Sequence, residues 1–283
     1  MIDLDYLKQL DRFSIVLKKR VISQYSGSRQ SQSFGEGLIF RDYREYIPGD
    51  DFRSIDWKVY ARTDKLYLRR YEEERNLKVH VVVDGSSSMD FGNPRKFDYA
   101  AQLAIGFAYM GMRNNEKFEI SSFSDDLVVF TPKKGKSQLI GLLEFLSSMR
   151  VKGQSNLYQS LRAYKRIIHS KSLVIIISDF LYDIEQIRET LLMFKKSEVI
   201  VVQVLDMVEK DLDYQGQLIL TDAENELKIK TFVSKRMQKD YRKRLLEHIY
   251  EIKDICDDMG ATFISVTSNV PIFETFHYIL TRT

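Results

Sequence analysis

Short apolar runs that alternate with helical stretches dominate the sequence from residue 77 onward. The apolar runs occupy residues 79–83, 173–177, 198–205 and 261–266, and they are rich in valine and isoleucine. Such a run is typical of a strand that is buried on both faces of a sheet. Strands that alternate with helices predict crossover connections and a mainly parallel sheet with helices on both sides. We therefore expect an α/β fold with a doubly wound, mainly parallel sheet over residues 77–283.

Two segments of different character precede this pattern. Residues 1–34 combine apolar residues at helical spacing with a stretch rich in Ser, Gln and Gly, which predicts an N-terminal helix and a linker. Residues 35–76 are aromatic and charged and contain several turn signals, which predicts a small β-rich appendage. A small hairpin insertion is expected near residues 216–230, inside the larger domain.

Composition excludes several classes of protein. The only cysteine is Cys256, so an intramolecular disulfide and a cysteine-based metal site are both excluded. The 43 basic and 40 acidic residues give a net charge of +3 without a regional excess, and no nucleic-acid partner is expected. The alternative is DNA binding through a small basic group, which would comprise Lys18, Lys19, Arg20 and Arg29.

The apolar runs are also informative about membranes. The run over residues 173–177 is far shorter than the roughly 20 residues that cross a bilayer, so no transmembrane segment is expected. Asp3 and Asp5 stand where a signal peptide carries basic residues. We expect a cytoplasmic protein.

Hydroxyl and carboxyl side chains gather in three loops of the larger domain. Asp84, Ser86 and Ser88 follow the first apolar run, Ser155 precedes a helical stretch, and Asp179 follows the run over residues 173–177. Ligands of open α/β sheets bind outside the carboxyl ends of the strands, where these loops are expected. Hard oxygen donors suit Mg²⁺, with Mn²⁺ as the alternative. Each loop by itself is also compatible with ordinary caps and turns.

The five residues together resemble the metal-ion-dependent adhesion site of von Willebrand factor A domains. That family folds as a doubly wound sheet. The resemblance implies that Ser86 and Ser88 ligate the cation through their hydroxyls and that Ser155 takes the place usually held by threonine. It also implies that Asp84 and Asp179 act directly or through water. One coordination position would stay open for an Asp or Glu side chain of a partner protein.

The preceding segment resembles the signature of the bacterial domain-of-unknown-function family fifty-eight. The residues that carry this resemblance are Gly35-Glu36-Gly37-Leu38-Ile39-Phe40-Arg41-Asp42-Tyr43-Arg44-Glu45-Tyr46, Pro48-Gly49-Asp50-Asp51, Arg53-Ser54-Ile55-Asp56-Trp57, Ala61-Arg62 and Leu66-Tyr67-Leu68-Arg69-Arg70-Tyr71-Glu72. Members join this segment to a von Willebrand factor A domain and are typically encoded near MoxR-type AAA+ ATPases. The resemblance covers residues 30–283 and implies an adaptor whose partner is a MoxR-type ATPase or its client.

The signature is dense in charges of both signs. Two interpretations are open: an ion-pair network that holds the small sheet together, or a docking surface. Because charges of alternating sign tend to pair among themselves, we favour the network. Its predicted members are Arg41, Arg44, Asp50, Asp51, Arg53, Asp56 and Arg62.

Enzymatic function is the alternative to an adaptor. The nucleophile motif Gly-x-Ser-x-Gly and the phosphate-binding loop Gly-x-x-x-x-Gly-Lys-[Ser/Thr] are both absent. His80 lies within the first apolar run, and nothing in the sequence aims it at Ser86 or Ser88. A metal-dependent hydrolase of phosphoesters is the competing hypothesis. We expect a protein that is not an enzyme and that has no catalytic residues.

Overall fold

The protein is described from a computed structural model, in which the chain divides into two compact units. The smaller unit comprises Val16–Asn76, and the larger comprises Met1–Ile15 together with Leu77–Thr283. Most of the predicted N-terminal helix, the predicted linker and the basic group formed by Lys18, Lys19, Arg20 and Arg29 lie outside the described residues. The structure describes residues 6, 9–10, 38–73, 78–113, 117–130, 137–168, 172–214, 216–221 and 227–282.

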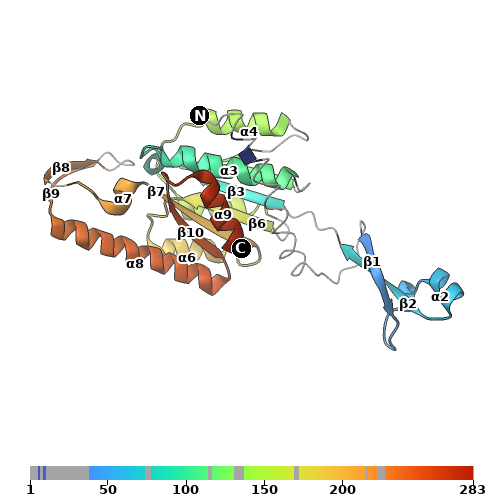
Figure 1. Cartoon of the computed structure of the whole chain (residues 1–283). Helices are drawn as coiled ribbons and strands as arrows, with labels where there is room; N and C mark the ends of the chain where they lie inside the picture. Colours follow the sequence, from blue (N-terminus) through green and yellow to red (C-terminus); the bar gives the residue numbers. More distant parts are fainter. Residues whose placement is uncertain are drawn as a thin grey trace. The chain divides into compact units, whose positions relative to one another are not determined.

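A central sheet with strand order β10-β7-β6-β3-β4-β5 organises the larger unit (Figure 1). Neighbouring strands pair in parallel except at one edge, where β5 is antiparallel to β4. The expected mainly parallel sheet is therefore confirmed. The strands are β3 (Lys78–Asp84), β4 (Lys117–Phe123), β5 (Leu127–Phe130), β6 (Ser172–Ser178), β7 (Glu198–Leu205) and β10 (Thr262–Thr267).

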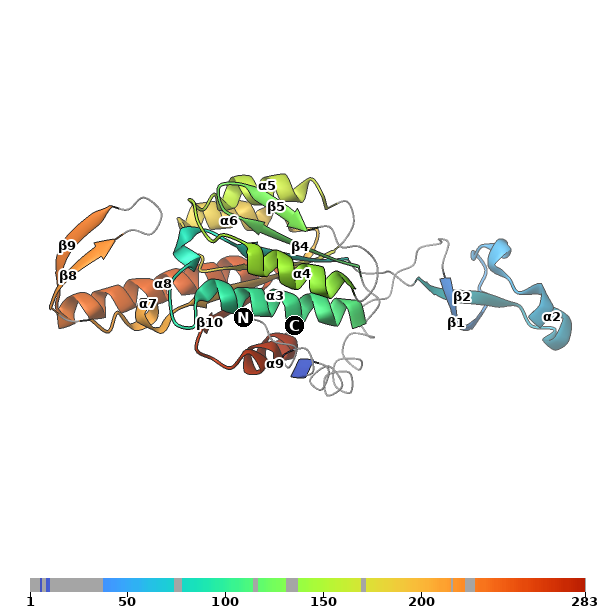
Figure 2. The ribbon, with the colours of Figure 1, turned by 90° about the horizontal axis from the view of Figure 1, so that it is seen from above.

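Helices cover both faces of this sheet, as the continuous apolar runs predicted (Figure 2). One apolar core lies between the sheet and α3, α4 and α9, and the other lies between the sheet and α5, α6 and α8. The helices are η2 (Ser87–Met89), α3 (Lys96–Arg113), α4 (Ser137–Ser148), α5 (Leu157–Lys165), α6 (Ile184–Leu192), α7 (Met207–Asp211), α8 (Lys235–Met259) and α9 (Ile272–Arg282).

The N-terminal residues that are described belong to the first of these cores. Leu10 is buried, and the Tyr6 hydroxyl donates a 2.6 Å hydrogen bond to the Gln102 carbonyl of α3. Tyr6 and Leu10 therefore pack with the residues of this core.

Helix α7 was not predicted from the sequence. It has five residues, which is too short for apolar periodicity to show. Its beginning is nevertheless well defined, because Asp206 and Glu209 form a capping box in which each side chain bonds the backbone of the other. This helix follows β7 directly and so lies at the carboxyl edge of the sheet.

A separate antiparallel hairpin follows α7. It consists of β8 (Gly216–Thr221) and β9 (Lys228–Val233), and both views show it beyond the beginning of α8, away from the central sheet (Figures 1 and 2). The amide of Gln238 on α8 donates hydrogen bonds to the carbonyls of Leu212 and Tyr214. These bonds attach the connection between α7 and the hairpin to α8.

The smaller unit combines an antiparallel strand pair with two short helices. The strands are β1 (Leu38–Glu45) and β2 (Tyr67–Glu73), which pair with each other. Between them in the sequence lie η1 (Phe52–Ser54) and α2 (Trp57–Thr63). The sequence did not predict α2, although its cap was visible: the Asp56 carboxylate accepts a 2.9 Å hydrogen bond from the Lys58 amide.

Three predicted members of the ion-pair network, Arg44, Asp50 and Asp56, form ion pairs in the described part of this unit, and Asp56 does so with Arg69, which was not a predicted member. Arg44 donates a 2.7 Å hydrogen bond to Asp50. The buried Asp56 accepts hydrogen bonds from Arg69 at 2.8 Å and from the Tyr43 hydroxyl at 3.0 Å. The guanidinium of Arg69 holds the pKa of Asp56 well below its usual range. Because Asp56 also caps α2, one carboxylate joins the strand pair to the helix.

A second polar cluster lies inside the larger unit, between β3 and β4. The Glu119 carboxylate accepts hydrogen bonds from Tyr164 at 3.0 Å and from Lys78 at 3.1 Å, and the Tyr164 hydroxyl also contacts His80 Nδ1 at 2.7 Å. Together with His80, these contacts lower the pKa of Glu119 to about 2 despite its burial. The cluster therefore stabilises the ionised carboxylate.

We expect Glu119→Gln to lower the free energy of unfolding at pH 7 by roughly 3 kcal/mol, which is the scale of a pKa shift of this size. A carboxyl whose pKa is depressed in the folded state contributes stability above its unfolded pKa and loses it as the pH falls toward the folded pKa. The difference in the free energy of unfolding between the wild type and Glu119→Gln should therefore shrink as the pH falls from about 4.3 to about 2. Urea unfolding at a series of pH values measures it, and a difference independent of pH would contradict the assignment.

Candidate metal centre

The five predicted site residues lie at the carboxyl edge of the central sheet. Asp84 is the last residue of β3, Asp179 follows β6 directly, and Ser155 lies just before α5. Strands β3 and β6 are neighbours in the sheet, so their carboxyl ends are adjacent. The strand order thus brings together residues that are up to 95 positions apart in the sequence.

The first loop is folded tightly around its aspartate. The Asp84 carboxylate accepts a 2.9 Å hydrogen bond from the Ser86 amide, which turns the chain back toward β3. Ser86 stands at the beginning of η2, but its hydroxyl makes no cap hydrogen bond there. That hydroxyl instead lies 3.1 Å from the Ser88 hydroxyl. The hydroxyl of Ser86 therefore faces the other site residues and does not cap η2.

The first loop contacts both of the others. The Ser88 hydroxyl donates a 2.7 Å hydrogen bond to Asp179 Oδ2, and the Ser155 hydroxyl donates one of 3.4 Å to Asp84 Oδ2. Asp84, Ser86 and Asp179 are buried, whereas Ser88 and Ser155 are half-buried. The structure brings all five predicted residues into one cluster of oxygen atoms that can be reached from the side of the two half-buried serines.

Backbone contacts hold the second loop against the first. The Ser87 amide donates to the Gly153 carbonyl, and the Lys152 amide donates to the Gly85 carbonyl, both at 3.1 Å. The Asp125 carboxylate accepts a 2.8 Å hydrogen bond from the Gln154 amide. Gly153 has a φ of +92°, a conformation that favours glycine. These contacts fix the position of Ser155.

The third loop passes through an unusual conformation at Phe180. Its φ is +50°, although a side chain makes this region costly by about 1–2 kcal/mol. The ring is fully buried in the core beneath α6 and α8, and the Phe180 carbonyl lies 2.7 Å from His248 Nε2. Burial of the ring offsets the backbone cost, and the turn places Asp179 at the site.

A family comparison bears on this arrangement. The family described as "Protein of unknown function DUF58" matches residues 42–251, which includes part of the smaller unit and all five site residues. The chain belongs to the DUF58 family.

Two proteins with sequences similar to this DUF58 protein are both named as uncharacterized. An uncharacterized protein of Mycobacterium tuberculosis, Rv1480, is 25% identical over 268 residues, which covers 92% of this chain and 84% of the relative. The uncharacterized protein YeaD of Bacillus subtilis is 23% identical over 104 residues, covering 37% of this chain and 25% of YeaD.

Two solved structures are similar to part of the DUF58 chain at low scores. One is an aerotolerance-related membrane protein from Bacteroides fragilis, with a TM-score of 0.45, 15% sequence identity and coverage of 73% of this chain and 100% of that one. The other is proximal thread matrix protein 1 from the mussel byssus with a zinc-occupied MIDAS motif, with a TM-score of 0.42, 13% identity and coverage of 73% and 44%. At these values the similarities carry no argument about the ligand of the DUF58 protein.

Two further residues contact Asp84 that the sequence analysis missed. The Ser178 hydroxyl donates a 2.7 Å hydrogen bond to Asp84 Oδ2, and the Tyr182 hydroxyl donates one of 2.5 Å to the same oxygen. Tyr182 also contacts the Ser155 hydroxyl. Both residues flank Asp179 closely in sequence, and that proximity was the available signal. Burial, and then the charge of Asp84, raises the pKa of Tyr182 well above its usual value, so the hydroxyl keeps its proton as a donor.

A buried lysine was missed as well. Lys96, the first residue of α3, has a fully buried side chain whose ammonium lies 2.9 Å from Asp179 Oδ2 and 2.5 Å from Glu209 Oε1. Burial alone would lower the pKa of Lys96, but the charges of Asp179 and Glu209 raise it above its usual value. The signal in the sequence was a lysine at the beginning of an apolar helix, where the helix dipole disfavours a positive charge.

The charges of the cluster match a divalent cation. Two acidic side chains, Asp179 and Glu209, contact one ammonium, that of Lys96, and the charge of a third, Asp84, acts on Asp179. Every hydrogen bond that the structure gives to the Asp84 carboxylate comes from a neutral donor. Burial, and then the charge of Asp179, raises the pKa of Asp84. A buried carboxylate without a cationic partner is costly, so the hard oxygen set fits a dication such as Mg²⁺ or Mn²⁺.

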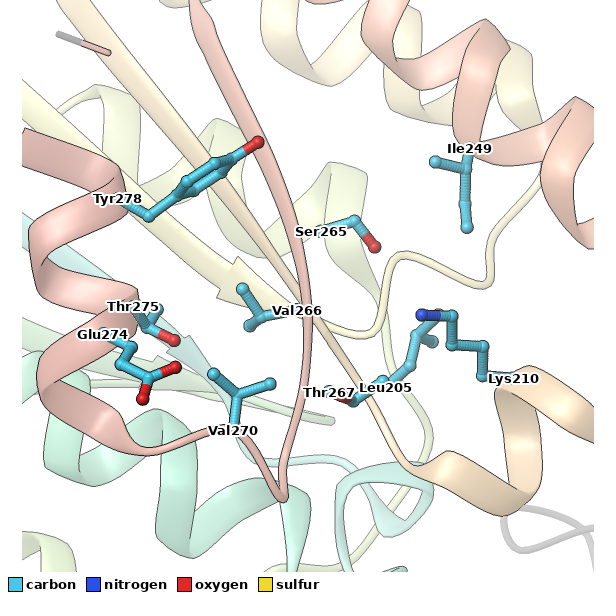
Figure 3. Close-up of a pocket in the computed structure, with 10 residues that line it drawn as sticks. All are labelled: Leu205, Lys210, Ile249, Ser265, Val266, Thr267, Val270, Glu274, Thr275 and Tyr278. Atoms are coloured by element: carbon cyan, nitrogen blue, oxygen red, sulfur yellow. The ribbon is translucent and has the colours of Figure 1, made fainter. Parts of the chain in front are cut away.

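Within the described residues, no group of three or more His, Cys, Asp or Glu side chains is arranged to hold a metal ion, so the candidate site depends on its serine hydroxyls as well as on its carboxylates. A pocket of about 300 Å³ beside β10 is lined by Lys210 on one side and by Glu274 and Tyr278 on the other (Figure 3). None of the five predicted site residues lines it. His80 contacts Tyr164 in the Glu119 cluster rather than either site serine.

Proposed function

We propose that this chain is a non-enzymatic adaptor that binds an acidic residue of a partner protein through a divalent cation. The convergence of Asp84, Ser86, Ser88, Ser155 and Asp179 from three loops supports this proposal more than any other observation. In it, the serine hydroxyls and the two carboxylates hold Mg²⁺ or Mn²⁺, as the resemblance to metal-ion-dependent adhesion sites implies. The cation supplies a concentrated positive charge, and a coordination position on the open side receives an Asp or Glu of the partner.

The surroundings of the site favour a protein as the partner. Two of the loops that carry site residues also expose a large apolar side chain: Phe91 lies three residues after Ser88, and Leu181 lies two residues after Asp179, with exposed fractions of 43% and 45%. Met207, at the beginning of α7 and two residues before Glu209, is 42% exposed. In protein interfaces, contacts beside a central polar interaction exclude water from it, and exposed aromatic and aliphatic side chains can make such contacts.

The resemblance of residues 35–72 to the family signature suggests the identity of the partner protein. On that resemblance we propose a MoxR-type AAA+ ATPase or one of its clients, with the chain acting in the assembly or maturation of a protein complex. No helix in the described part of the chain combines the length and the apolarity needed to cross a membrane. The cytoplasmic location stays a prediction.

Affinity capture tests the proposal. The immobilised full-length chain should retain its partner from a cell lysate in the presence of Mg²⁺ and release it when EDTA is added. The Asp84→Ala, Ser86→Ala double variant should lose this retention, because it removes a carboxylate and a hydroxyl of the cation site. Leu181→Asp should lose the partner but bind Mn²⁺ as the wild type does, because Leu181 is exposed beside the site.

Two outcomes would contradict the adaptor. One is capture that resists EDTA and is undiminished in the double variant. The other is metal-dependent turnover of p-nitrophenyl phosphate or bis(p-nitrophenyl) phosphate by the purified chain, abolished in the double variant, which would support the competing phosphoester hydrolase.

A further inference from the structure

The ammonium of Lys96 shares an oxygen atom with the proposed cation site. Asp179 Oδ2 accepts hydrogen bonds from the Ser88 hydroxyl at 2.7 Å and from Lys96 Nζ at 2.9 Å. Ser88 and Asp179 are both proposed to hold the dication. The positive charge of Lys96 therefore lies next to the place that another positive charge would take.

Two neighbouring carboxylates compensate the burial of Lys96. Its side chain is 0% exposed, and burial of a lone ammonium costs several kcal/mol. Asp179 and Glu209 together supply the compensation. Glu209 is held in place for this contact, because its other oxygen accepts a 2.9 Å hydrogen bond from the Asp206 amide in the capping box of α7.

A bound dication would change the interactions among the charges of Lys96, Asp179 and Glu209. A second positive charge near Asp179 repels the ammonium at short range, where the low dielectric strengthens the interaction. Glu209 partly offsets this repulsion, because it is a second carboxylate that the ammonium already contacts. The balance between Lys96 and Glu209 thus modulates the affinity that the ligands of the site have for a dication.

We propose that Lys96 is a built-in competitor of the dication, which lowers its affinity and makes its binding reversible, and that Glu209 moderates this competition. The inference rests on the proposed function, because it concerns the same cation site. It assigns a role to a lysine and a glutamate that are not themselves proposed as ligands. Through α7, it also connects the occupancy of the site to the segment that leads into the β8–β9 hairpin.

Opposite charge changes should shift the affinity in opposite directions. Lys96→Met removes the competing charge, and we expect the dissociation constant for Mn²⁺ to fall at least tenfold. Glu209→Gln leaves the ammonium less compensated, and we expect the dissociation constant to rise about fivefold or more. Two residues that served only to stabilise the fold would not produce effects of opposite sign.

The measurement is Mn²⁺ titration of the full chain by electron paramagnetic resonance, with thermal unfolding in EDTA and in Mn²⁺ as a second readout. Lys210→Met is the matched control, because it removes an exposed lysine from the same helix as Glu209, and its dissociation constant should stay within twofold of wild type. Lys96→Gln serves as a second variant if Lys96→Met does not fold, since glutamine still donates a hydrogen bond to Asp179.

The outcomes separate this inference from the proposed function. Tighter Mn²⁺ binding by the Lys96 variant together with weaker Mn²⁺ binding by Glu209→Gln supports the inference. Mn²⁺ binding by the Lys96 variant alone, with none by the wild type, supports it as well. If the wild type binds Mn²⁺ and the Lys96 variants bind equally or more weakly, the inference is wrong and the cation site stands. If neither the wild type nor any variant binds Mn²⁺ at millimolar concentration, both are overturned.

Discussion

Asparagine in place of Asp84 is expected to weaken Mg²⁺ and Mn²⁺ binding by roughly 100-fold or more, which exceeds the effect typical of residues that only support metal ligands. Asp84 is buried at the centre of the site, and its carboxylate accepts hydrogen bonds from three hydroxyl groups and one amide. Asparagine has nearly the same shape but no charge. The attraction for a dication is therefore lost while the fold is kept.

Stability measurements distinguish this effect from general damage. Since the wild-type carboxylate has no cationic hydrogen-bond donor, Asp84→Asn should unfold in EDTA at a temperature equal to or above that of the wild type. Added Mg²⁺ should raise the unfolding temperature of the wild type but not of the variant, because a ligand stabilises only the state that binds it.

The matched control for this prediction is Asp183→Asn. Asp183 is exposed, lies four residues after Asp179 and caps α6, a role that asparagine fills equally well. Its metal affinity and unfolding temperature should match those of the wild type. Equal metal affinity in Asp84→Asn and wild type would show that the cation, if bound, lies elsewhere.

Alanine in place of Gly153 is expected to lower the free energy of unfolding by about 2–4 kcal/mol and to weaken Mn²⁺ binding at least tenfold. Gly153 has a φ of +92°, and an added Cβ would lie 2.1 Å from Asp125 Oδ2. Asp125 cannot move away freely, because its other oxygen holds the Gln154 amide at 2.8 Å. The loop must shift, and Ser155 shifts with it.

Gly216→Ala separates the two causes of this effect. Gly216 has a similar φ of +100°, but an added Cβ would meet no atom within 4 Å. This variant should show only the backbone cost, about 1–2 kcal/mol, and an unchanged affinity for Mn²⁺. Urea unfolding and Mn²⁺ titration measure both variants. Equal losses of stability and affinity in the two would contradict the role of the Asp125 contact.

The central sheet could be predicted because its signal is local. A strand that is buried on both faces is mostly apolar, so β6 and β7 appear in the sequence as runs dominated by valine and isoleucine. The long helix α8 could be predicted because 25 residues give its apolar spacing room to repeat, and Ser234 and Gly260 cap its two ends. The short helices α2 and α7 lack that length and escaped prediction.

Only part of the site could be predicted, because only part of it has a local signal in the sequence. Asp84, Ser86, Ser88, Ser155 and Asp179 could be named from the sequence because each follows or precedes a predictable element and the five together match a known pattern. Tyr182, Ser178, Lys96 and Glu209 were not named. The contacts of Ser178 and Tyr182 with Asp84, of Lys96 with Asp179 and of Glu209 with Lys96 arise only when β3, β6 and β7 are placed side by side.

The sequence by itself therefore determined the sheet, its covering helices and the oxygen atoms offered at one edge, since all of these follow from the spacing of apolar and polar residues along the chain. Only the tertiary structure decided the charge balance at that edge. The ammonium of Lys96 reaches Asp179 across 83 positions and Glu209 across 113, and such distances leave no trace in local patterns. Electrostatic energy depends on separation in space, which the order of residues does not specify.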